Sequence, residues 1–158
     1  AELSFPDPAL SELLTDLTDA GVTLAELQGV TDKELDATYR LGYSAYLAGN
    51  YRGALDVFRF LCAYQHTEAR SWHGLAACQQ MLGAHESAVL SYFNAALLGD
   101  DAAHELLHAA DCCLADGDRE GALHLLHLVI LAGADEPAGT GVGERAEALI
   151  DLLEQAAA

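Results

Sequence analysis

The stretch WHGLAACQQMLGAHESAVLSYF, from Trp72 to Phe93, decides the fold of this chain. A tryptophan and a run of small residues lead to Gly83, and Ala88 is followed four positions later by the bulky Tyr92. Small side chains let two antiparallel helices approach closely, and a glycine can end the first helix in the left-handed conformation. The stretch therefore predicts a helical hairpin, with helices over about 69–82 and 85–98.

The same pattern recurs before and after this stretch at a spacing of 34 residues. This period, with its small, glycine, alanine and bulky positions, is typical of tetratricopeptide repeats. We therefore predict an all-α solenoid of three helical hairpins with N- and C-terminal capping helices. The aligned positions are Leu41, Leu75 and Ala109; Gly42, Ala76 and Ala110; Gly49, Gly83 and Gly117; Ala54, Ala88 and Ala122; and Phe58, Tyr92 and Leu126.

The period divides the chain into three units and two flanks. We place the units at 35–68, 69–102 and 103–136, with first helices over about 35–48, 69–82 and 103–115 and second helices over 51–64, 85–98 and 119–132. Residues 1–34 are predicted to form an N-terminal helical cap, with one helix over 8–20 and a short second helix capped by Thr23. Residues 137–158 are predicted to hold a linker and a helix over 144–157. Stacked repeats need covered ends, so both flanks are expected to cap the array.

Three tyrosines of the first unit, Tyr39, Tyr43 and Tyr46, are spaced to form one stripe on a helix. In this repeat class the first helices line the concave face, and the stripe falls in the columns that face the hollow. We expect Thr38, Leu41, Gly42 and Ala45 to fill the core columns, which leaves the rings free to hold an extended apolar segment. Arg70 and Asp111 are expected to bond its backbone. The predicted groove residues are Tyr39, Tyr43, Tyr46, Leu47, Arg70, His73, Ala77, Gln80, Met81 and Asp111.

Composition and charge exclude several classes of partner. The chain has 25 acidic and 7 basic residues, a formal net charge of −18, and 52% apolar residues. The charge argues against binding to nucleic acid or to anionic membranes, because both kinds of binding depend on Lys and Arg. The apolar runs are too short to span a bilayer, and no export signal opens the chain. The four cysteines sit in apolar helical sequence without a C-x-x-C pair, and we expect them to be buried thiols in a reducing cytosol.

The sequence carries no signature of catalysis, of a cofactor or of a metal site. His104 and His108, and also His124 and His127, have helical spacing, but neither pair has the further ligands that a zinc site needs. The sequence holds no nucleophile elbow, catalytic-cysteine signature or phosphate-binding loop. We predict neither an enzyme, a cofactor nor a bound metal.

Roughly residues 20–132 resemble the class II chaperones of bacterial type III secretion. The residues that carry the resemblance are LAGNYRGALDVFRFLC, GLAACQQMLG followed by Ala88 and Tyr92, HAADCCL from His108 to Leu114, and G-x-T-L-x-x-L from Gly21 to Leu27. The resemblance implies a bacterial cytosolic chaperone for hydrophobic, pore-forming translocators. It implies that a Pro-x-Leu-x-x-Pro segment of the translocator lies extended in the groove against the tyrosines. It also implies a homodimer formed through the N-terminal helices, about residues 8–30.

The sequence is also compatible with a second function, that of a generic repeat scaffold between soluble proteins. A scaffold that clamps a free C-terminal carboxylate would need Lys, Arg and Asn on the concave columns. Those columns hold Tyr39, Tyr43, His73 and Ala77, with Arg70 as the cationic residue, so this variant of the scaffold is disfavoured.

Overall fold

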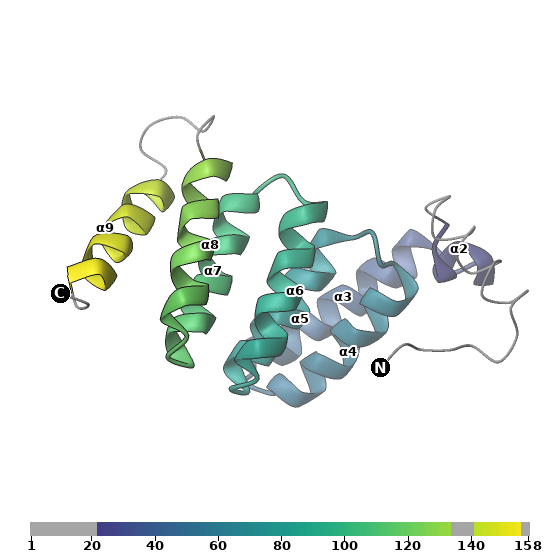
Figure 1. Ribbon diagram of the computed structural model, residues 1–158. Helices are drawn as coiled ribbons and strands as arrows, with labels where there is room; N and C mark the ends of the chain where they lie inside the picture. Colours follow the sequence, from purple (N-terminus) through teal and green to yellow (C-terminus); the bar gives the residue numbers. More distant parts are fainter. Residues whose placement is uncertain (1–21, 134–140, 156–158) are drawn as a thin grey trace, which may run out of the picture.

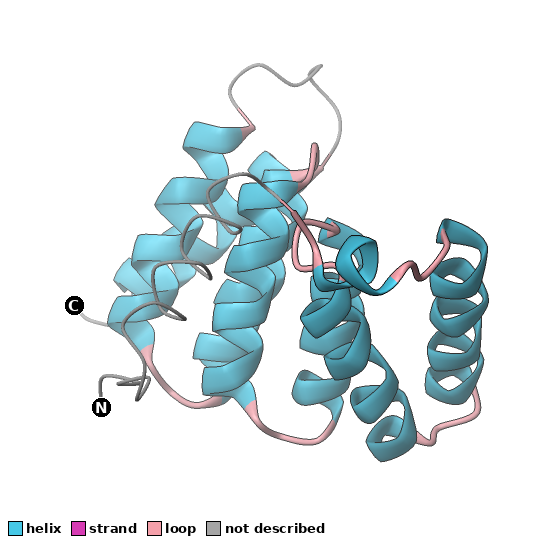
Figure 2. Cartoon of the chain, turned by 90° about the vertical axis from the view of Figure 1, so that its right-hand side faces the viewer, coloured by secondary structure: helices cyan, strands magenta, loops and turns pink. Residues whose placement is uncertain are grey.

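The computed structural model describes residues 22–133 and 141–155, and all regular structure within these ranges is helical. Short loops join the helices within residues 22–133 (Figure 2). The all-α prediction is confirmed. The helices are α2 (Leu24–Gln28), α3 (Asp32–Leu47), α4 (Tyr51–Tyr64), α5 (Ala69–Met81), α6 (His85–Leu98), α7 (Ala102–Ala115), α8 (Arg119–Ala132) and α9 (Val142–Gln155).

The six central helices form three antiparallel hairpins that stack side by side. Within each hairpin the two helices pack together, and the second helix also packs against the first helix of the next hairpin. The result is a two-layer solenoid (Figure 1). We call α3, α5 and α7 the first-helix layer and α4, α6 and α8 the second-helix layer. The three predicted second helices, 51–64, 85–98 and 119–132, have the observed bounds.

Side-chain caps fix where the helices begin. The Thr31 hydroxyl accepts the Glu34 backbone N–H, and the Glu34 carboxylate accepts the Thr31 backbone N–H at 2.9 Å. This reciprocal pair satisfies two backbone donors that the first turn leaves open. Helix α3 therefore starts at Asp32, three residues before the predicted start at 35. Thr23 and Glu26 make the same arrangement at α2.

Glycines end the first helix of every hairpin as predicted. Gly49, Gly83 and Gly117 have φ values of 77°, 74° and 78°, in the left-handed region that side chains disfavour. Each backbone N–H donates to a carbonyl in the last turn of the preceding helix. The recurrence at 34 residues is thus a recurrence of one turn geometry.

Small and bulky columns meet inside the hairpins, also as predicted. Ala54, Ala88 and Ala122 are fully buried, and so are the bulky side chains four residues later. Glycines give the Phe58 ring its space: a Cβ built on Gly74 would lie 2.4 Å from that ring. The buried residues form one apolar cluster around Phe58 and a second that runs from Tyr92 to α9.

The described parts of the flanks lie at the two ends of the array. Helix α2 contacts α4, where the Tyr64 hydroxyl donates to Gln28 Oε1 at 3.1 Å. Helix α9 packs on α8 and α7 and buries Val142, Ala146 and Ile150. The predicted helix over 8–20 lies outside the described residues, as does most of the linker. The division into cap, units and C-terminal segment stays a prediction.

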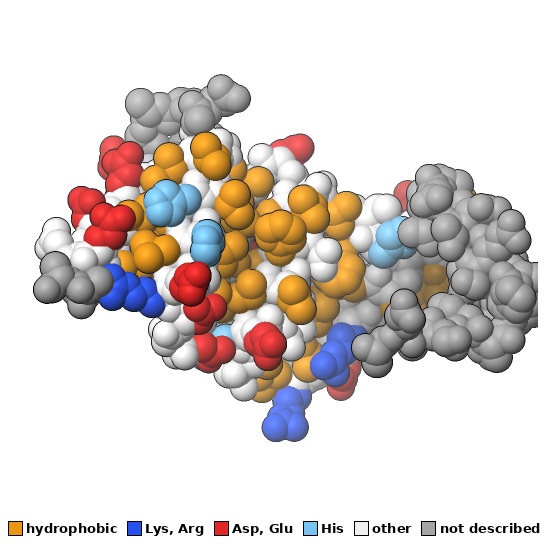
Figure 3. Space-filling model, viewed as in Figure 1, with side chains coloured by type: hydrophobic (Ala, Val, Ile, Leu, Met, Phe, Trp, Pro, Cys, Tyr) orange, Lys and Arg blue, Asp and Glu red, His pale blue; other side chains and the backbone are white. Residues whose placement is uncertain are grey.

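Apolar side chains also gather on the outer surface of the second-helix layer (Figure 3). Leu90 and Leu97 of α6 and Leu131 of α8 are among the exposed ones. None of the helices in the described ranges combines the length and the apolar character that a bilayer crossing requires.

Candidate functional site

The three tyrosines of α3 lie along its face as their spacing predicts. The Tyr39 and Tyr43 rings are parallel, with centroids 6.4 Å apart. The Tyr46 ring meets Tyr51 edge-on at 5.3 Å. Tyr43 is 51% exposed, and the other two stripe residues are half-buried. Burial raises the pKa of the Tyr39 and Tyr46 hydroxyls, so both stay protonated and can donate hydrogen bonds at neutral pH.

A hollow of about 100 Å³ opens between this stripe and helix α5. Its volume is several times the ~30 Å³ that a water molecule occupies. Five of its seven lining residues were predicted groove residues. We call it the tyrosine hollow, and its lining residues are Tyr39, Tyr43, Tyr46, Phe58, His73, Gly74 and Ala77.

The expectation that Leu41 fills a core column is wrong, because this side chain is 63% exposed. Leu75 and Ala109 occupy the same column of the next two units and are buried, since α4 and α6 cover them. Within the described residues no hairpin precedes α3, so Leu41 has no such cover. Tyr39 and Tyr46 instead pack against the cluster around Phe58, so the stripe serves the core and the hollow together.

The remaining apolar and amide residues of the predicted groove have different surroundings. Leu47 and Met81 are exposed near the ends of α3 and α5. Gln80 accepts a hydrogen bond from the Tyr92 hydroxyl at 2.7 Å, so its amide is fixed by the second-helix layer. Neither Leu47, Met81 nor Gln80 lines the tyrosine hollow.

The two charged groove residues already have protein partners. The Arg70 guanidinium lies 3.3 Å from Asp36 Oδ1 and 4.7 Å from the centre of the Tyr39 ring. Asp111 accepts two contacts from the Arg145 guanidinium of α9, at 2.9 and 3.0 Å. Any bond from Arg70 or Asp111 to a bound backbone must therefore share or displace these contacts.

Sequence reasoning missed a polar cluster between α5 and α7. His73 Nδ1 lies 2.9 Å and 3.0 Å from the two carboxylate oxygens of Glu105. The His108 ring stacks on Tyr92 with centroids 5.2 Å apart, and lies 6.0 Å from the His73 ring. A signal was present: Glu105 follows His73 by 32 residues, two fewer than the repeat period. That offset brings side chains of neighbouring units together.

The surroundings shift the pKa values of the two histidines of this cluster in opposite directions. The Glu105 hydrogen bond raises the pKa of His73 against the opposing effect of burial. Burial and the neighbouring His73 lower the pKa of His108. The surroundings therefore favour protonation of His73, next to the Glu105 carboxylate, and oppose protonation of His108.

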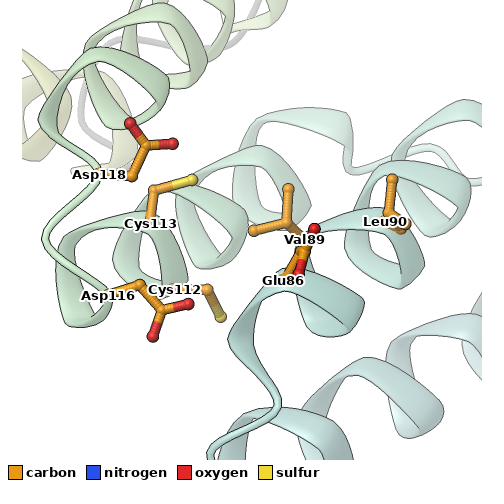
Figure 4. Close-up of a pocket in the computed structure, with 7 residues that line it drawn as sticks. All are labelled: Glu86, Val89, Leu90, Cys112, Cys113, Asp116 and Asp118. Atoms are coloured by element: carbon orange, nitrogen blue, oxygen red, sulfur yellow. The ribbon is translucent and has the colours of Figure 1, made fainter.

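A second hollow, of about 370 Å³, lies between α6 and the end of α7 and contains none of the predicted groove residues. Figure 4 shows that its apolar and acidic side chains come both from α6 and from the end of α7 with the loop that follows. Burial raises the pKa of Cys112 to about 11 and also raises that of Cys113, so both thiols stay protonated at neutral pH. The lining residues are Glu86, Val89, Leu90, Cys112, Cys113, Asp116 and Asp118.

All four cysteines are buried free thiols, as predicted. In residues 22–133 and 141–155, no group of three or more His, Cys, Asp or Glu side chains has an arrangement that could hold a metal ion.

Comparison with known proteins identifies the family. A tetratricopeptide repeat model matches residues 35–67. Low calcium response locus protein H of Yersinia pseudotuberculosis is 30% identical over 133 residues, which are 84% of this chain and 79% of that protein. The type III secretion translocator chaperone SycD of Yersinia enterocolitica is 30% identical, with a TM-score of 0.73 over 84% of this chain and 98% of that one. The chain belongs to the type III secretion translocator chaperones.

A further relative extends the comparison to a bound complex. PcrH of Pseudomonas aeruginosa has been solved with the chaperone binding region of PopD. In that complex PcrH is 33% identical to this chain, with a TM-score of 0.74 over 82% of this chain and 98% of its own. SycD has likewise been solved with a peptide of the translocator YopD. Two relatives of this chain have thus been seen with segments of the proteins that they bind.

Proposed function

We propose that this chain binds an extended apolar segment of a type III secretion translocator in the groove of the first-helix layer. The bound segment is of the Pro-x-Leu-x-x-Pro type, and its leucine enters the tyrosine hollow. Binding keeps the translocator dissolved and unassembled until export. The observation that carries the proposal is a hollow walled by three tyrosines in a translocator chaperone.

The chemistry of the hollow suits such a segment. Tyr43 presents an exposed ring beside the half-buried Tyr39 and Tyr46, and Phe58 closes the floor. A ring with a hydroxyl offers apolar area for a side chain and a polar end for a peptide backbone. The proposal also assigns the exposed Leu47 and Met81 to the apolar wall of the groove, and Arg70 and Asp111 to its polar edges.

The proposal places the protein in the bacterial cytoplasm, as a binding protein without catalytic activity and without direct contact to a membrane. It includes a homodimer formed through about residues 8–30. SycD of Yersinia enterocolitica has been solved in an alternative dimer, which supports self-association in a relative.

A scaffold that clamps a carboxylate fits the described groove less well. Arg70 and Arg145 both face carboxylates of the chain itself, at 3.3 Å and 2.9 Å. Such a scaffold would need these cations to be free, so the interpretation as an apolar chaperone groove is preferred.

The substitution Tyr43→Ala tests the proposal. The probe is a blocked, fluorescently labelled Pro-x-Leu-x-x-Pro peptide whose affinity is measured by anisotropy. Removing an anchor ring is expected to cost about 1–3 kcal/mol of binding free energy, a weakening of roughly 5- to 150-fold. Because the ring is half exposed, helical circular dichroism should be unchanged.

The matched control is Leu97→Ala, which removes an apolar side chain that is 70% exposed on the second-helix layer. This variant should bind the peptide like the parent. Equal affinity of the Tyr43→Ala variant and the parent, or no peptide binding by the parent, would contradict the proposed groove. The double change Tyr43→Ala with Tyr46→Ala should abolish co-purification of a translocator client.

A further inference from the structure

His73 stands between two hollows of the groove. It lines the tyrosine hollow and also a wider, open hollow of about 360 Å³ that includes Arg70, Asp101 and Glu105. A segment that leaves the tyrosine hollow toward α7 must pass this imidazole. His73 therefore occupies the position where the apolar part of the groove meets its charged part.

Glu105 determines which ring nitrogen of His73 is available to a ligand. Its carboxylate side chain is only 16% exposed, whereas that of His73 is 44% exposed. A carboxylate can only accept, so Nδ1–H is the donor in the contacts at 2.9 and 3.0 Å. Nε2 is then the ring nitrogen left for a ligand, and no other described residue forms a hydrogen bond with it.

The charged form of His73 is favoured by its surroundings. Glu105 raises the pKa of the imidazole through the hydrogen bond and its charge, and Asp101 adds to this effect. The His108 ring lies 6.0 Å from the His73 ring, and burial lowers its pKa, so it is neutral at neutral pH. The titratable and charged groups that face His73 are Glu105 and His108 of α7, Asp100 and Asp101 of the preceding loop, Tyr92 of α6, Arg70 of α5, and the tyrosines of α3.

We infer that His73 is the polar recognition residue of the groove and that its Nε2–H donates to a main-chain carbonyl of the bound segment. Glu105 acts as a positioning residue that holds the ring through Nδ1. The inference rests on the proposed function and adds an imidazole donor to the tyrosine hydroxyls and the polar edges already assigned to the groove.

An extended, proline-containing segment calls for such a donor. Each proline lacks the backbone N–H but keeps its carbonyl, so acceptors outnumber donors along the segment. An extended segment also makes no internal hydrogen bonds. A charged imidazole is a stronger donor than a neutral group, which makes His73 well suited to one of these carbonyls.

The inference predicts that affinity depends on pH in one direction. His73 is a base with a raised pKa, so its charged, donating form is complete below the ordinary value of about 6.5 and is lost as pH rises through the folded-state pKa. Nδ1–H then stays with Glu105 while Nε2 becomes an acceptor that faces a carbonyl. Peptide affinity should therefore fall with rising pH.

The test uses the full chain and a blocked Pro-x-Leu-x-x-Pro peptide whose variable positions are alanine, serine or glutamine, so that only the protein titrates. Affinity measured from pH 5.5 to 8.5 should fall by about tenfold, which corresponds to one charge-assisted hydrogen bond. Nuclear magnetic resonance of the His73 ring should show that saturating peptide raises the imidazole pKa. Such a rise is the reciprocal of the affinity change.

Two variants separate recognition from structure. Glu105→Gln keeps an acceptor for Nδ1–H but removes the charge, so the midpoint of the affinity profile should move to lower pH. His73→Leu should weaken binding about tenfold at pH 5.5 and give a flat profile. His85→Gln is the matched control, because His85 also faces a carboxylate, Asp116, but lies outside the groove.

The outcomes distinguish the inference from the function on which it rests. A parent protein that binds the peptide with the same affinity throughout the pH range, or a His73→Leu variant that keeps the pH profile of the parent, overturns the role of His73 and leaves the groove intact. Absence of peptide binding by the parent at every pH overturns the proposed function itself. Circular dichroism at each pH checks that every variant remains folded.

Discussion

At the scale of single residues, the groove depends on the absence of a side chain at Gly74 of α5. Gly74 lies beside the Phe58 ring, and a Cβ at this position would approach the ring to 2.4 Å. Phe58 is buried and forms the floor of the tyrosine hollow, so the ring has little room to move away. The glycine thus sets both the packing of the first two hairpins and the depth of the hollow.

The substitution Gly74→Ala should lower the free energy of unfolding by about 1–3 kcal/mol, because the strain of overpacking exceeds the gain in helix propensity. Gly143→Ala is the matched control. Gly143 also lies in a helix, but a Cβ there would meet no atom within 4 Å, so the alanine should stabilise by up to about 1 kcal/mol. Urea unfolding measures both values. A stabilising Gly74→Ala change would show that the two hairpins can separate without cost.

At the scale of elements, α9 behaves like the first helix of a fourth hairpin. The Arg145 guanidinium pairs with Asp111, 34 residues earlier, and the Arg119 guanidinium donates to the carbonyl of Leu153, 34 residues later. Contacts at a spacing of 34 residues thus continue across the linker, although the residue pattern of the repeat does not recur in α9. Val142, Ala146 and Ile150 cover the open side of the last hairpin.

Apolar packing rather than the ion pair should hold α9 in place. Ile150→Ala removes a buried side chain and should cost about 2–5 kcal/mol of unfolding free energy. Arg145→Ala breaks a pair whose arginine side chain is 53% exposed, and should cost about 1 kcal/mol or less. Chemical denaturation of the two variants ranks them. The reverse order would mean that the charge contact, and not the apolar stripe, docks the helix.

At the scale of the whole molecule, repulsion among acidic residues opposes folding. The chain carries a formal charge of −18, and the few arginines that contact carboxylates do so at exposed sites. Exposed ion pairs contribute little, whereas excess charge of one sign destabilises the compact state. The same charge opposes nonspecific association of copies through the exposed leucines of the second-helix layer.

Added salt should therefore stabilise this protein. Raising sodium chloride from 20 to 200 mM shortens the range of charge repulsion. We expect the midpoint of thermal unfolding to rise by roughly 2–4 °C, which corresponds to about 1 kcal/mol for a chain of this size. Differential scanning calorimetry at the two concentrations measures it. A fall in the midpoint would assign the larger role to attractive ion pairs.

Much of the fold could be predicted from the 34-residue period. The period predicted the hairpins, the glycine turns at Gly49, Gly83 and Gly117 and the buried columns of the second helices, because each depends on neighbours along the chain or on one adjacent helix. A local signal also predicted where a helix begins: Thr23 caps α2 as expected, and the T-x-x-E pattern at Thr31 marks the observed start of α3.

The environment of each side chain in the groove was decided by the tertiary structure. Leu41 and Leu75 share a column, yet among the described residues only Leu75 of the two has a preceding hairpin to cover it. Arg70 contacts Asp36, Asp111 contacts Arg145, and His73 contacts Glu105. The partners in each pair are 32 to 34 residues apart in the sequence. The sequence by itself determined which helices form and how they pair, because periodicity and caps act locally. Which groove residues are free to meet a ligand depends on how successive hairpins stack, and that stacking brings together side chains one repeat apart.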